Sequence, residues 1–336
     1  MTQRATLEEV AARAGVSRAT ASRVLRGATN VSEAARAAVH AAAHEVSYSP
    51  NRAARSLVTG RSDSIAFMVD ETEERMFADP FFLGMLRSVQ VATAAAGLQL
   101  VFTVVSRAED RERFVAYAAG GHVDGVLLLS LHGTDDLPHR LEAEGVPTVL
   151  SGRPFDDARG LFYVDADNVG GGRIATAHLV DSGRRVVATV TGALDMCAGQ
   201  DRLTGYRQAV TASGATLDES LVEPAGFTTA EGYAATERLL ARRPDVDAIF
   251  AGSDLAAFGA IRALHAAGRR VPDDVAVVGF DDIRDAAEHQ PPLSTVRQPV
   301  GALGSAMTRM LLARVTGAVP DPNVVLPVEL VVRGTG

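Results

Sequence analysis

Arginines carry the most distinctive chemistry near the start of the chain. Arg18 and Arg23 flank a stretch of small side chains, and their planar guanidinium groups are suited to paired hydrogen bonds with a phosphate, a carboxylate or guanine. Residues 1 to 61 hold nine arginines and four glutamates, a charge of +5, so the chain's total of −8 leaves −13 for the rest. This asymmetry favours a polyanionic partner at one end. A solvated basic helical module would show the same charge.

The patterns required for nucleophilic or metal chemistry are missing. The chain has no HExxH, GxSxG or CxxC motif, and its eight histidines are scattered. The segment GGGR, residues 170–173, lacks the lysine of a phosphate-binding loop, so we expect its three glycines to pack closely at a helix start. We therefore predict no enzyme, no metal and no cofactor. The single cysteine, Cys197, is interpreted as structural in a reducing compartment.

Two short helices are predicted to position the arginines. Apolar side chains repeat at helical spacing from residue 7 to 14, and Thr6 with Glu9 forms a capping box. Gly15 ends this helix and Ser17 caps the next, which makes a helix-turn-helix whose second helix enters the major groove of DNA. A third helix begins after Ser32. The inward-facing side chains of the second and third helices are Ala21, Val24, Leu25, Ala35, Val39, Ala42, Ala43 and Val46.

The spacing is specific to one family. The segment TLEEVAARAGVSRATASRVLRG, followed by VSEAARAAVHAAAHEVSYSPNRAARSL, resembles the DNA-binding headpiece of the LacI/GalR family of bacterial transcription regulators. The resemblance implies that Arg18, Ala19 and Arg23 read base edges. The other DNA contacts that it implies, mostly to phosphates, are Thr6, Ser17, Thr20, Asn30, Ser32, Tyr48, Asn51 and Arg55. Each of these could also be a cap or a turn residue.

The segment SPNRAARSLVTGRS, residues 49 to 62, poses a packing problem. A helix between Pro50 and Gly60 is too short to be stable alone in water, yet it contains Leu57. The resemblance implies a hinge helix that folds only on DNA, pairs with that of its dimer mate and inserts Leu57 into the minor groove. A pyrimidine–purine step kinks most easily around such a wedge. The alternative is that Leu57 packs against the body of the protein.

From residue 63 onward, apolar runs alternate with helical stretches. The runs are SIAFMV, LQLVFTVV, DGVLLLS, VPTVLS, RVVATVTG, DAIFAGSD and VAVVGFDD. This alternation predicts parallel sheets covered by helices on both faces. A strand-loop-helix unit occurs twice, and Gly84 in the first copy is equivalent to Gly205 in the second. We predict an all-α headpiece followed by two doubly wound α/β lobes. The family resemblance extends over this part and implies a periplasmic-binding-protein fold with a small-molecule cleft between the lobes.

The predicted domain boundaries follow from these patterns. They are a headpiece at 1–48, a hinge at 49–61, and an effector-binding and dimerisation domain at 62–336. Within this last domain the resemblance implies three crossings, which divide it into an N-lobe (62–164 and 295–320) and a C-lobe (165–294 and 321–336).

Ligands of open α/β sheets bind beyond the carboxyl ends of the strands. This rule and the family's matching positions give the candidate pocket residues, which are Asp79, Phe81, Phe82, Ser130, His132, Arg153, Arg202, Ser253 and Asp281. Carboxylates and guanidinium groups bind paired sugar hydroxyls, and phenyl rings contact the sugar's C–H face. Alternatives remain at three positions: Phe81 and Phe82 as core, and Asp281 as a helix cap. Ser253 stands where many sugar regulators carry Asn, and Gly152, the residue before Arg153, stands where many carry Asp.

The sequence therefore predicts a ligand-controlled repressor of sugar-catabolism genes. We expect a cytoplasmic homodimer on pseudo-palindromic double-stranded operator DNA, with no membrane segment and no tetramerising heptads after residue 336. The effector is expected to be a mono- or oligosaccharide that releases DNA, although some family members need ligand to bind. The segments DPFF, SLHG, SGRP and DMCAGQDRLTGY are similar to cellobiose and oligosaccharide regulators. A solute-binding protein or an enzyme on the same fold is the alternative.

Overall fold

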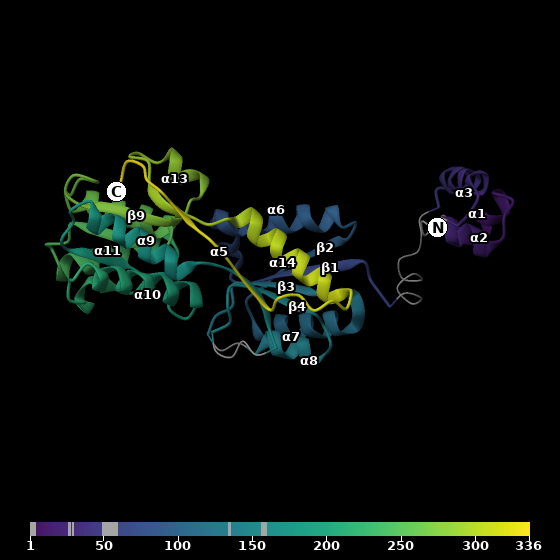
Figure 1. Cartoon of the computed structure of the whole chain (residues 1–336), viewed down its shortest axis with the longest axis horizontal. Coiled ribbons are helices and arrows are strands. Elements are labelled where there is room, and N and C mark those ends of the chain that lie inside the picture. Colours follow the sequence, from purple (N-terminus) through teal and green to yellow (C-terminus); the bar gives the residue numbers. More distant parts are fainter. Residues whose placement is uncertain (1–4, 26–27, 29, 49–59, 134–135, 156–159) are drawn as a thin grey trace. The chain divides into compact units, whose positions relative to one another are not determined.

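The computed structural model describes residues 5–25, 28, 30–48, 60–133, 136–155 and 160–336. The chain divides after Ser62 into two compact units, the headpiece and the effector unit (Figure 1). The predicted hinge, with Asn51, Arg55 and Leu57, lies outside the described residues except for Gly60 and Arg61. No helix in the described ranges is long and apolar enough to cross a membrane.

The headpiece contains the three predicted helices. They are α1 (Leu7–Arg13), α2 (Arg18–Leu25) and α3 (Glu33–Glu45). The capping box closes as expected, because the amide of Thr6 donates to Glu9 Oε2 at 2.8 Å and the amide of Glu9 donates to Thr6 Oγ1 at 3.3 Å. Gly15 joins α1 to α2 with a φ of +65°, a conformation that favours glycine. Val10, Ala21 and Val39 are fully buried where the three helices meet.

The effector unit contains two six-stranded sheets, one in each lobe. The N-lobe sheet is entirely parallel, in the order β11-β5-β4-β3-β1-β2. Its strands are β1 (Ser64–Asp70), β2 (Gln99–Val105), β3 (Val126–Leu129), β4 (Thr148–Ser151), β5 (Phe162–Ala166) and β11 (Asn323–Leu326). Its helices are α5 (Glu73–Ala78), α6 (Pro80–Ala95), α7 (Ala108–Tyr117), the π-helical turn η1 (Ala118–His122), α8 (Leu137–Ala143) and α14 (Val300–Val315).

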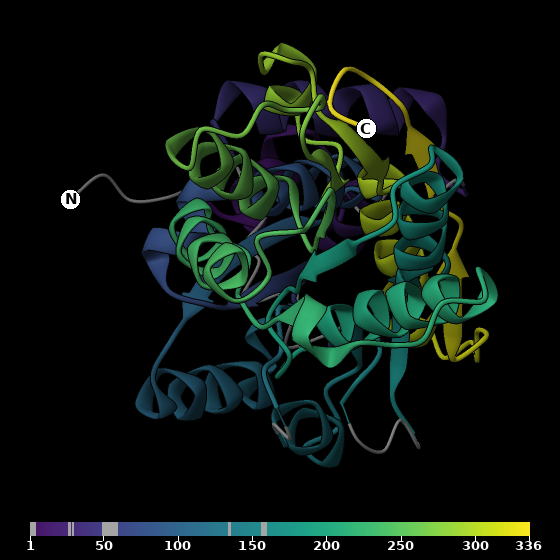
Figure 2. The ribbon, with the colours of Figure 1, turned by 90° about the vertical axis from the view of Figure 1, so that its left-hand side faces the viewer.

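The C-lobe sheet has the order β12-β10-β9-β8-β6-β7, and only β12 runs antiparallel to its neighbour. Its strands are β6 (Val187–Val190), β7 (Val222–Glu223), β8 (Ala248–Ala251), β9 (Ala276–Asp281), β10 (Ser294–Arg297) and β12 (Glu329–Val331). Its helices are α9 (Asn168–Asp181), α10 (Cys197–Ala212), the 3₁₀ turn η2 (Glu219–Leu221), α11 (Thr229–Arg242), α12 (Asp254–Ala266) and α13 (Arg284–Glu288). Figure 2 looks onto this lobe, with teal and green helices on both sides of its strands.

Helices cover both faces of each sheet, as the apolar strands predict. In the C-lobe, Ile249 of β8 packs towards α11 and α12, whereas the next residue, Phe250, packs towards α9 and α10. In the N-lobe, Phe67 faces α6 and α14, and Met68 faces α7 and α8. Successive side chains of a strand point to opposite faces, so each strand contributes to two cores. The doubly wound fold is confirmed.

The strand pairing moves the predicted lobe boundaries by a few residues. The boundaries at 164/165 and 294/295 would cut through β5 and β10, but each of these strands lies wholly in one sheet. The boundary at 320/321 would assign β11 to the C-lobe, although β11 pairs with β5 of the N-lobe. The chain therefore changes lobes after Ala166, Arg297 and Leu326. Hydrogen bonds to neighbouring strands, and not local apolarity, set these three points.

Glycines allow two helices of the C-lobe to touch through their backbones. A Cβ atom on Gly205 of α10 would lie 2.1 Å from the carbonyl oxygen of Val169, and one on Gly172 would lie 2.2 Å from that of Arg202. The glycines at 170–172 thus pack closely at the start of α9, as predicted. This approach also brings Arg202 of α10 against the first turn of α9.

Replacing Gly205 with alanine is expected to destabilise the effector unit. The new methyl group would overlap α9 backbone atoms that have no side-chain freedom, and such overpacking costs about 1–3 kcal/mol. Urea denaturation should show this loss for Gly205→Ala. Gly301→Ala in α14 is the control, because a Cβ there meets nothing within 4 Å and the helical position favours alanine. Equal stability of the two variants would contradict the close approach.

Candidate functional site

The headpiece presents the predicted base-reading side chains on the exposed side of α2. Arg18, Ala19 and Arg23 are all exposed, whereas Ala21 and Val24 of the same helix are buried. Arg18 Nε lies 2.6 Å from Glu8 Oε1 of α1, and Arg23 Nε donates to the Ala19 carbonyl at 3.4 Å. Both guanidinium groups therefore lie over α2 with solvent around them, free of the headpiece core.

The remaining described DNA candidates lie at helix starts and on the headpiece surface. Ser17 and Ser32 cap their helices by accepting from the amides of Thr20 and Ala35, at 3.1 and 3.4 Å. Thr6 and Asn30 are exposed. Tyr48 differs, because it is partly buried against the headpiece core. Exposed caps keep the amide groups of a helix N-terminus available to a phosphate.

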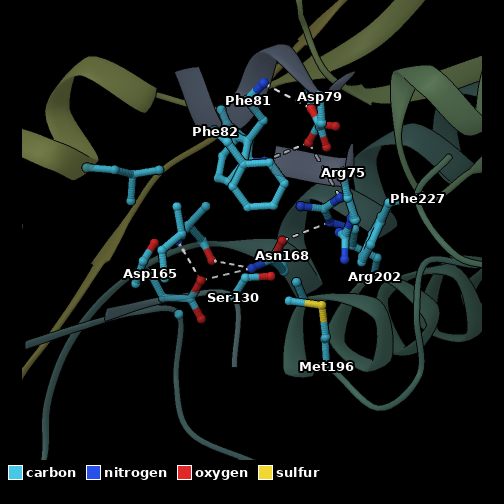
Figure 3. Close-up of a pocket in the computed structure, with 18 residues that line it drawn as sticks. Arg75, Asp79, Phe81, Phe82, Ser130, Asp165, Asn168, Met196, Arg202 and Phe227 are labelled. Atoms are coloured by element: carbon cyan, nitrogen blue, oxygen red, sulfur yellow. Dashed lines mark hydrogen bonds and ion pairs between the residues drawn. The ribbon is translucent and has the colours of Figure 1, made fainter. Parts of the chain in front are cut away.

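The effector unit has a pocket formed by residues of both lobes (Figure 3). It encloses about 620 Å³ of space, part of which is open to solvent. Its polar and aromatic lining includes Arg75, Asp79, Phe81, Phe82, Ser130, Asp165, Asn168, Met196, Arg202, Phe227, Asp281 and Gln298. Six of the nine predicted effector residues are among them, namely Asp79, Phe81, Phe82, Ser130, Arg202 and Asp281.

On the N-lobe side, Asp79 and two phenylalanines stand at the start of α6. Asp79 caps the helix by accepting from the Phe81 amide at 2.9 Å, and burial raises the pKa of its carboxyl group despite this bond. The rings of Phe81 and Phe82 meet edge to face, with centroids 5.8 Å apart. Phe82 belongs mostly to the core, whereas Phe81 is partly exposed, so Phe81 is the more accessible apolar surface.

On the C-lobe side, Arg202 is a buried charge with several partners. It donates to Asn168 Oδ1 at 2.9 Å and to the Gly252 carbonyl at 2.6 Å. Its Nη1 lies 3.5 Å from Asp281 Oδ1, and its guanidinium carbon lies 3.7 Å from the centroid of the Phe280 ring. Burial lowers the pKa of Arg202, against the neighbouring carboxylates.

Two aspartates of the pocket have strongly raised pKa values. Burial raises the pKa of Asp281 to about 7, against the charge of Arg202 and a hydrogen bond of 2.7 Å from Gln298 Nε2. Burial also raises the pKa of Asp165 to about 6, despite the amides of Arg153 and Ala166 that donate to it. Near neutral pH each carboxyl group can therefore either accept or donate a hydrogen bond.

Three predicted effector residues, His132, Arg153 and Ser253, are not among the residues that line this pocket. Ser253 caps α12, where its Oγ accepts from the Ala256 amide at 3.1 Å. Arg153 pairs with Asp201 of α10, with Nη2 to Oδ1 at 2.7 Å. His132 bridges Glu71 and Asp195, at 2.9 and 2.8 Å. Arg153 and His132 thus connect the lobes instead of lining the cavity. Each belongs to the N-lobe and contacts a carboxylate of the C-lobe, Asp201 for Arg153 and Asp195 for His132.

The sequence reasoning did not identify several lining residues. They are Arg75, Asp165, Asn168, Met196, Phe227 and Gln298. Asp165 lies in β5, and Gln298 directly follows β10. Neither strand has the continuous apolar run from which the other strands were predicted. Had these strands been predicted, the rule of carboxyl ends would have found both residues. Among the described residues no group of three or more His, Cys, Asp or Glu side chains could hold a metal ion.

The His132 bridge is expected to weaken in alkaline solution. Its hydrogen bond to Glu71, together with that to Asp195, raises the pKa of His132 to about 9, although burial opposes this shift. The stabilisation should be complete below the unfolded pKa of about 6.5 and disappear as the pH rises through about 9.

Urea midpoints of the wild type and His132→Gln should therefore differ most at pH 6 and converge by pH 10. His139→Gln is the control, because His139 is a surface histidine of the same lobe. A constant difference between wild type and His132→Gln across this range would exclude a charged bridge.

Comparisons with known proteins find relatives for both units of the chain. The family model for bacterial regulatory proteins of the lacI family matches residues 6–51, and the model for a periplasmic binding protein-like domain matches residues 176–335. The HTH-type transcriptional regulator CelR of Thermobifida fusca is 49% identical over 336 residues, which cover 99% of both chains.

Solved structures agree with this placement. A complex of the transcriptional regulator CelR with cellobiose has a TM-score of 0.80 and 47% identity, covering 99% of this chain and 100% of the other. The lac repressor dimer bound to operator and the anti-inducer ONPF has a TM-score of 0.86 and 27% identity, covering 99% of each chain. This chain belongs to the LacI family of bacterial regulatory proteins and is a DNA-binding transcription regulator.

Proposed function

We propose that the protein is a homodimeric repressor of sugar-catabolism genes that leaves its operator when a short neutral β-glucoside, such as cellobiose, binds between its lobes. The single observation that carries the effector proposal is the pocket that buried Arg202, paired with Asp281, lines together with Phe81. A guanidinium beside a carboxyl group suits adjacent hydroxyls, and a partly exposed phenyl ring suits the C–H face of a pyranose. The relatedness to CelR supports the same class of ligand.

The charge of the pocket favours a neutral ligand over a phosphorylated one. Two arginines line it, Arg75 and Arg202, against three aspartates, Asp79, Asp165 and Asp281. Each arginine already lies next to a carboxyl group, Glu71 for Arg75 and Asp281 for Arg202, and this weakens its attraction for a phosphate. A purine would be held best between two flat aromatic faces, whereas Phe81 and Phe82 meet edge to face.

The direction of control follows from where the ligand must act. A ligand shifts the conformational equilibrium only by binding one lobe arrangement better than the other. A sugar touching both walls of the pocket favours lobe closure. In our proposal, closure separates the paired hinge segments, residues 49–61, which lowers operator affinity.

Operator recognition rests on the headpiece. Arg18 and Arg23 are proposed to read base edges, with Ala19 against a thymine methyl, and the capped helix starts are proposed to contact phosphates. Two headpieces of a dimer would match a pseudo-palindromic operator. Asn51, Arg55 and Leu57 retain their proposed roles in the hinge.

Two other classes fit these observations less well. A solute-binding protein for uptake shares the fold of the effector unit, but it has no use for a helix-turn-helix unit. An enzyme on this fold is the second alternative, and it is less well supported because the relative that covers nearly the whole chain is a transcription regulator. We propose a non-enzymatic protein that acts in the cytoplasm, where its operator lies.

Cellobiose is expected to weaken operator binding. The operator fragment is selected from random DNA with the wild-type protein, and its affinity is measured by fluorescence anisotropy with and without cellobiose. Closure that favours the released state should reduce DNA affinity at least tenfold, which corresponds to a coupling of about 1.4 kcal/mol. Asp281→Asn should lose this response, whereas Arg207→Gln, at an exposed position of α10, should keep it. Tighter operator binding with cellobiose would reverse the proposed sign of control.

Arg23→Ala is expected to relax sequence preference at one position of each half-site. Losing a bidentate arginine–guanine contact costs about 1–3 kcal/mol of discrimination against other bases. Ser32→Ala is the matched headpiece variant and should weaken all sequences equally, because a phosphate contact carries no sequence information. Selection from random DNA with each variant measures both effects. Unchanged base preference in Arg23→Ala would remove Arg23 from base reading.

A further inference from the structure

Arg75 lies in the wall of the pocket, in the short helix α5 of the N-lobe (Figure 3). Its guanidinium carbon lies 5.5 Å from the centroid of the Phe82 ring and 5.1 Å from that of Phe227. Phe82 belongs to the N-lobe and Phe227 to the C-lobe. Arg75 therefore touches both walls, at the place where the lobes approach each other.

One end of the guanidinium is fixed by a network centred on Glu71. Arg75 Nη1 pairs with Glu71 Oε1, which also accepts from Ser130 Oγ at 2.5 Å and lies 2.9 Å from His132 Nε2. Burial opposes the charge of Glu71, but the hydrogen bond from His132 and the charge of Arg75 outweigh it, so the pKa of Glu71 lies below its ordinary value. The carboxylate thus remains charged and holds Nη1 in place.

The other edge of the guanidinium is incomplete. Arg75 Nε is buried and has no hydrogen-bond partner among the residues that the structure describes. A buried donor without a partner is costly, more so when it belongs to a charged group, and native proteins rarely keep one without a reason. Because Arg75 lines the pocket, an oxygen atom of a bound ligand can supply the missing acceptor.

We propose that Arg75 is a specificity-determining residue of the effector site, whose Nε–H donates to a hydroxyl oxygen of the bound sugar. This inference rests on the sugar-binding function proposed above and deepens it. The fixed Glu71 pair and the two phenyl rings set the direction of the Nε–H bond, so only a ligand with an oxygen at one place satisfies it. Since Phe227 comes from the opposite lobe, that contact forms in the closed pocket.

Arg75→Lys tests the role of the Nε–H bond. Lysine retains a positive charge for Glu71 but lacks the second donor edge of arginine. We expect cellobiose affinity, measured by calorimetry, to fall about 10- to 100-fold, as for the loss of a hydrogen bond to a charged group. Arg111→Lys is the matched control, because Arg111 pairs with Asp70, the residue before Glu71, and does not line the pocket.

Monodeoxy cellobioses separate a ligand contact from a structural role. For the sugar position that accepts from Nε, removing the hydroxyl should cost affinity in the wild type but little more in Arg75→Lys, because the two changes delete the same bond. The inference is overturned if Arg75→Lys binds cellobiose like the wild type, or if every deoxy sugar loses the same factor in both proteins. A wild-type protein that binds no cellobiose or other glucoside would instead overturn the proposed effector class, and the inference with it.

Discussion

The effector pocket depends on a buried positive charge that must be compensated from several directions. A guanidinium taken out of water costs several kcal/mol unless carboxylates and carbonyl groups replace its hydration. For Arg202 these partners come from α9, from the loop after β8 and from the end of β9, through Asn168, the Gly252 carbonyl and Asp281. The close backbone approach of Gly172 to Arg202 keeps α9 and α10 in the register that this arrangement requires. The position of one side chain therefore constrains three parts of the C-lobe.

The same logic of paired charges extends across the pocket to the N-lobe. Glu71 contacts Arg75, Ser130 and His132 through its carboxylate. His132 also contacts Asp195 of the C-lobe. Arg153 and Asp201 make a second pair between the lobes. These contacts lie around the cavity and hold its two walls near each other. The carboxyl groups of Asp165 and Asp281, which line the cavity, have raised pKa values. A neutral polyhydroxylated ligand fits such carboxyl groups, because its hydroxyls can both donate and accept hydrogen bonds.

The headpiece is stabilised differently from the effector unit. Its core is small, built largely from alanine and valine, and its caps and turn are local hydrogen bonds between residues three or four positions apart. The arginines of α2 take no part in that core. The side chains at positions 18 and 23 can therefore vary without changing the fold that presents them, whereas the pocket residues of the effector unit also support its structure.

The sequence by itself determined the features that local hydrogen bonds and apolar periodicity encode. The capping box at Thr6, the turn at Gly15 and the exposed face of α2 followed from spacing alone, as did seven strands and the close-packed glycines of α9. Only the tertiary structure decided that β5 and β10 bring Asp165 and Gln298 to the pocket, because these strands are defined by their neighbours in the sheet. It also decided that His132 meets Asp195 and that Arg75 meets Phe227. Those partners are far apart in the chain, and the energy of a long-range contact leaves no periodic pattern in the sequence.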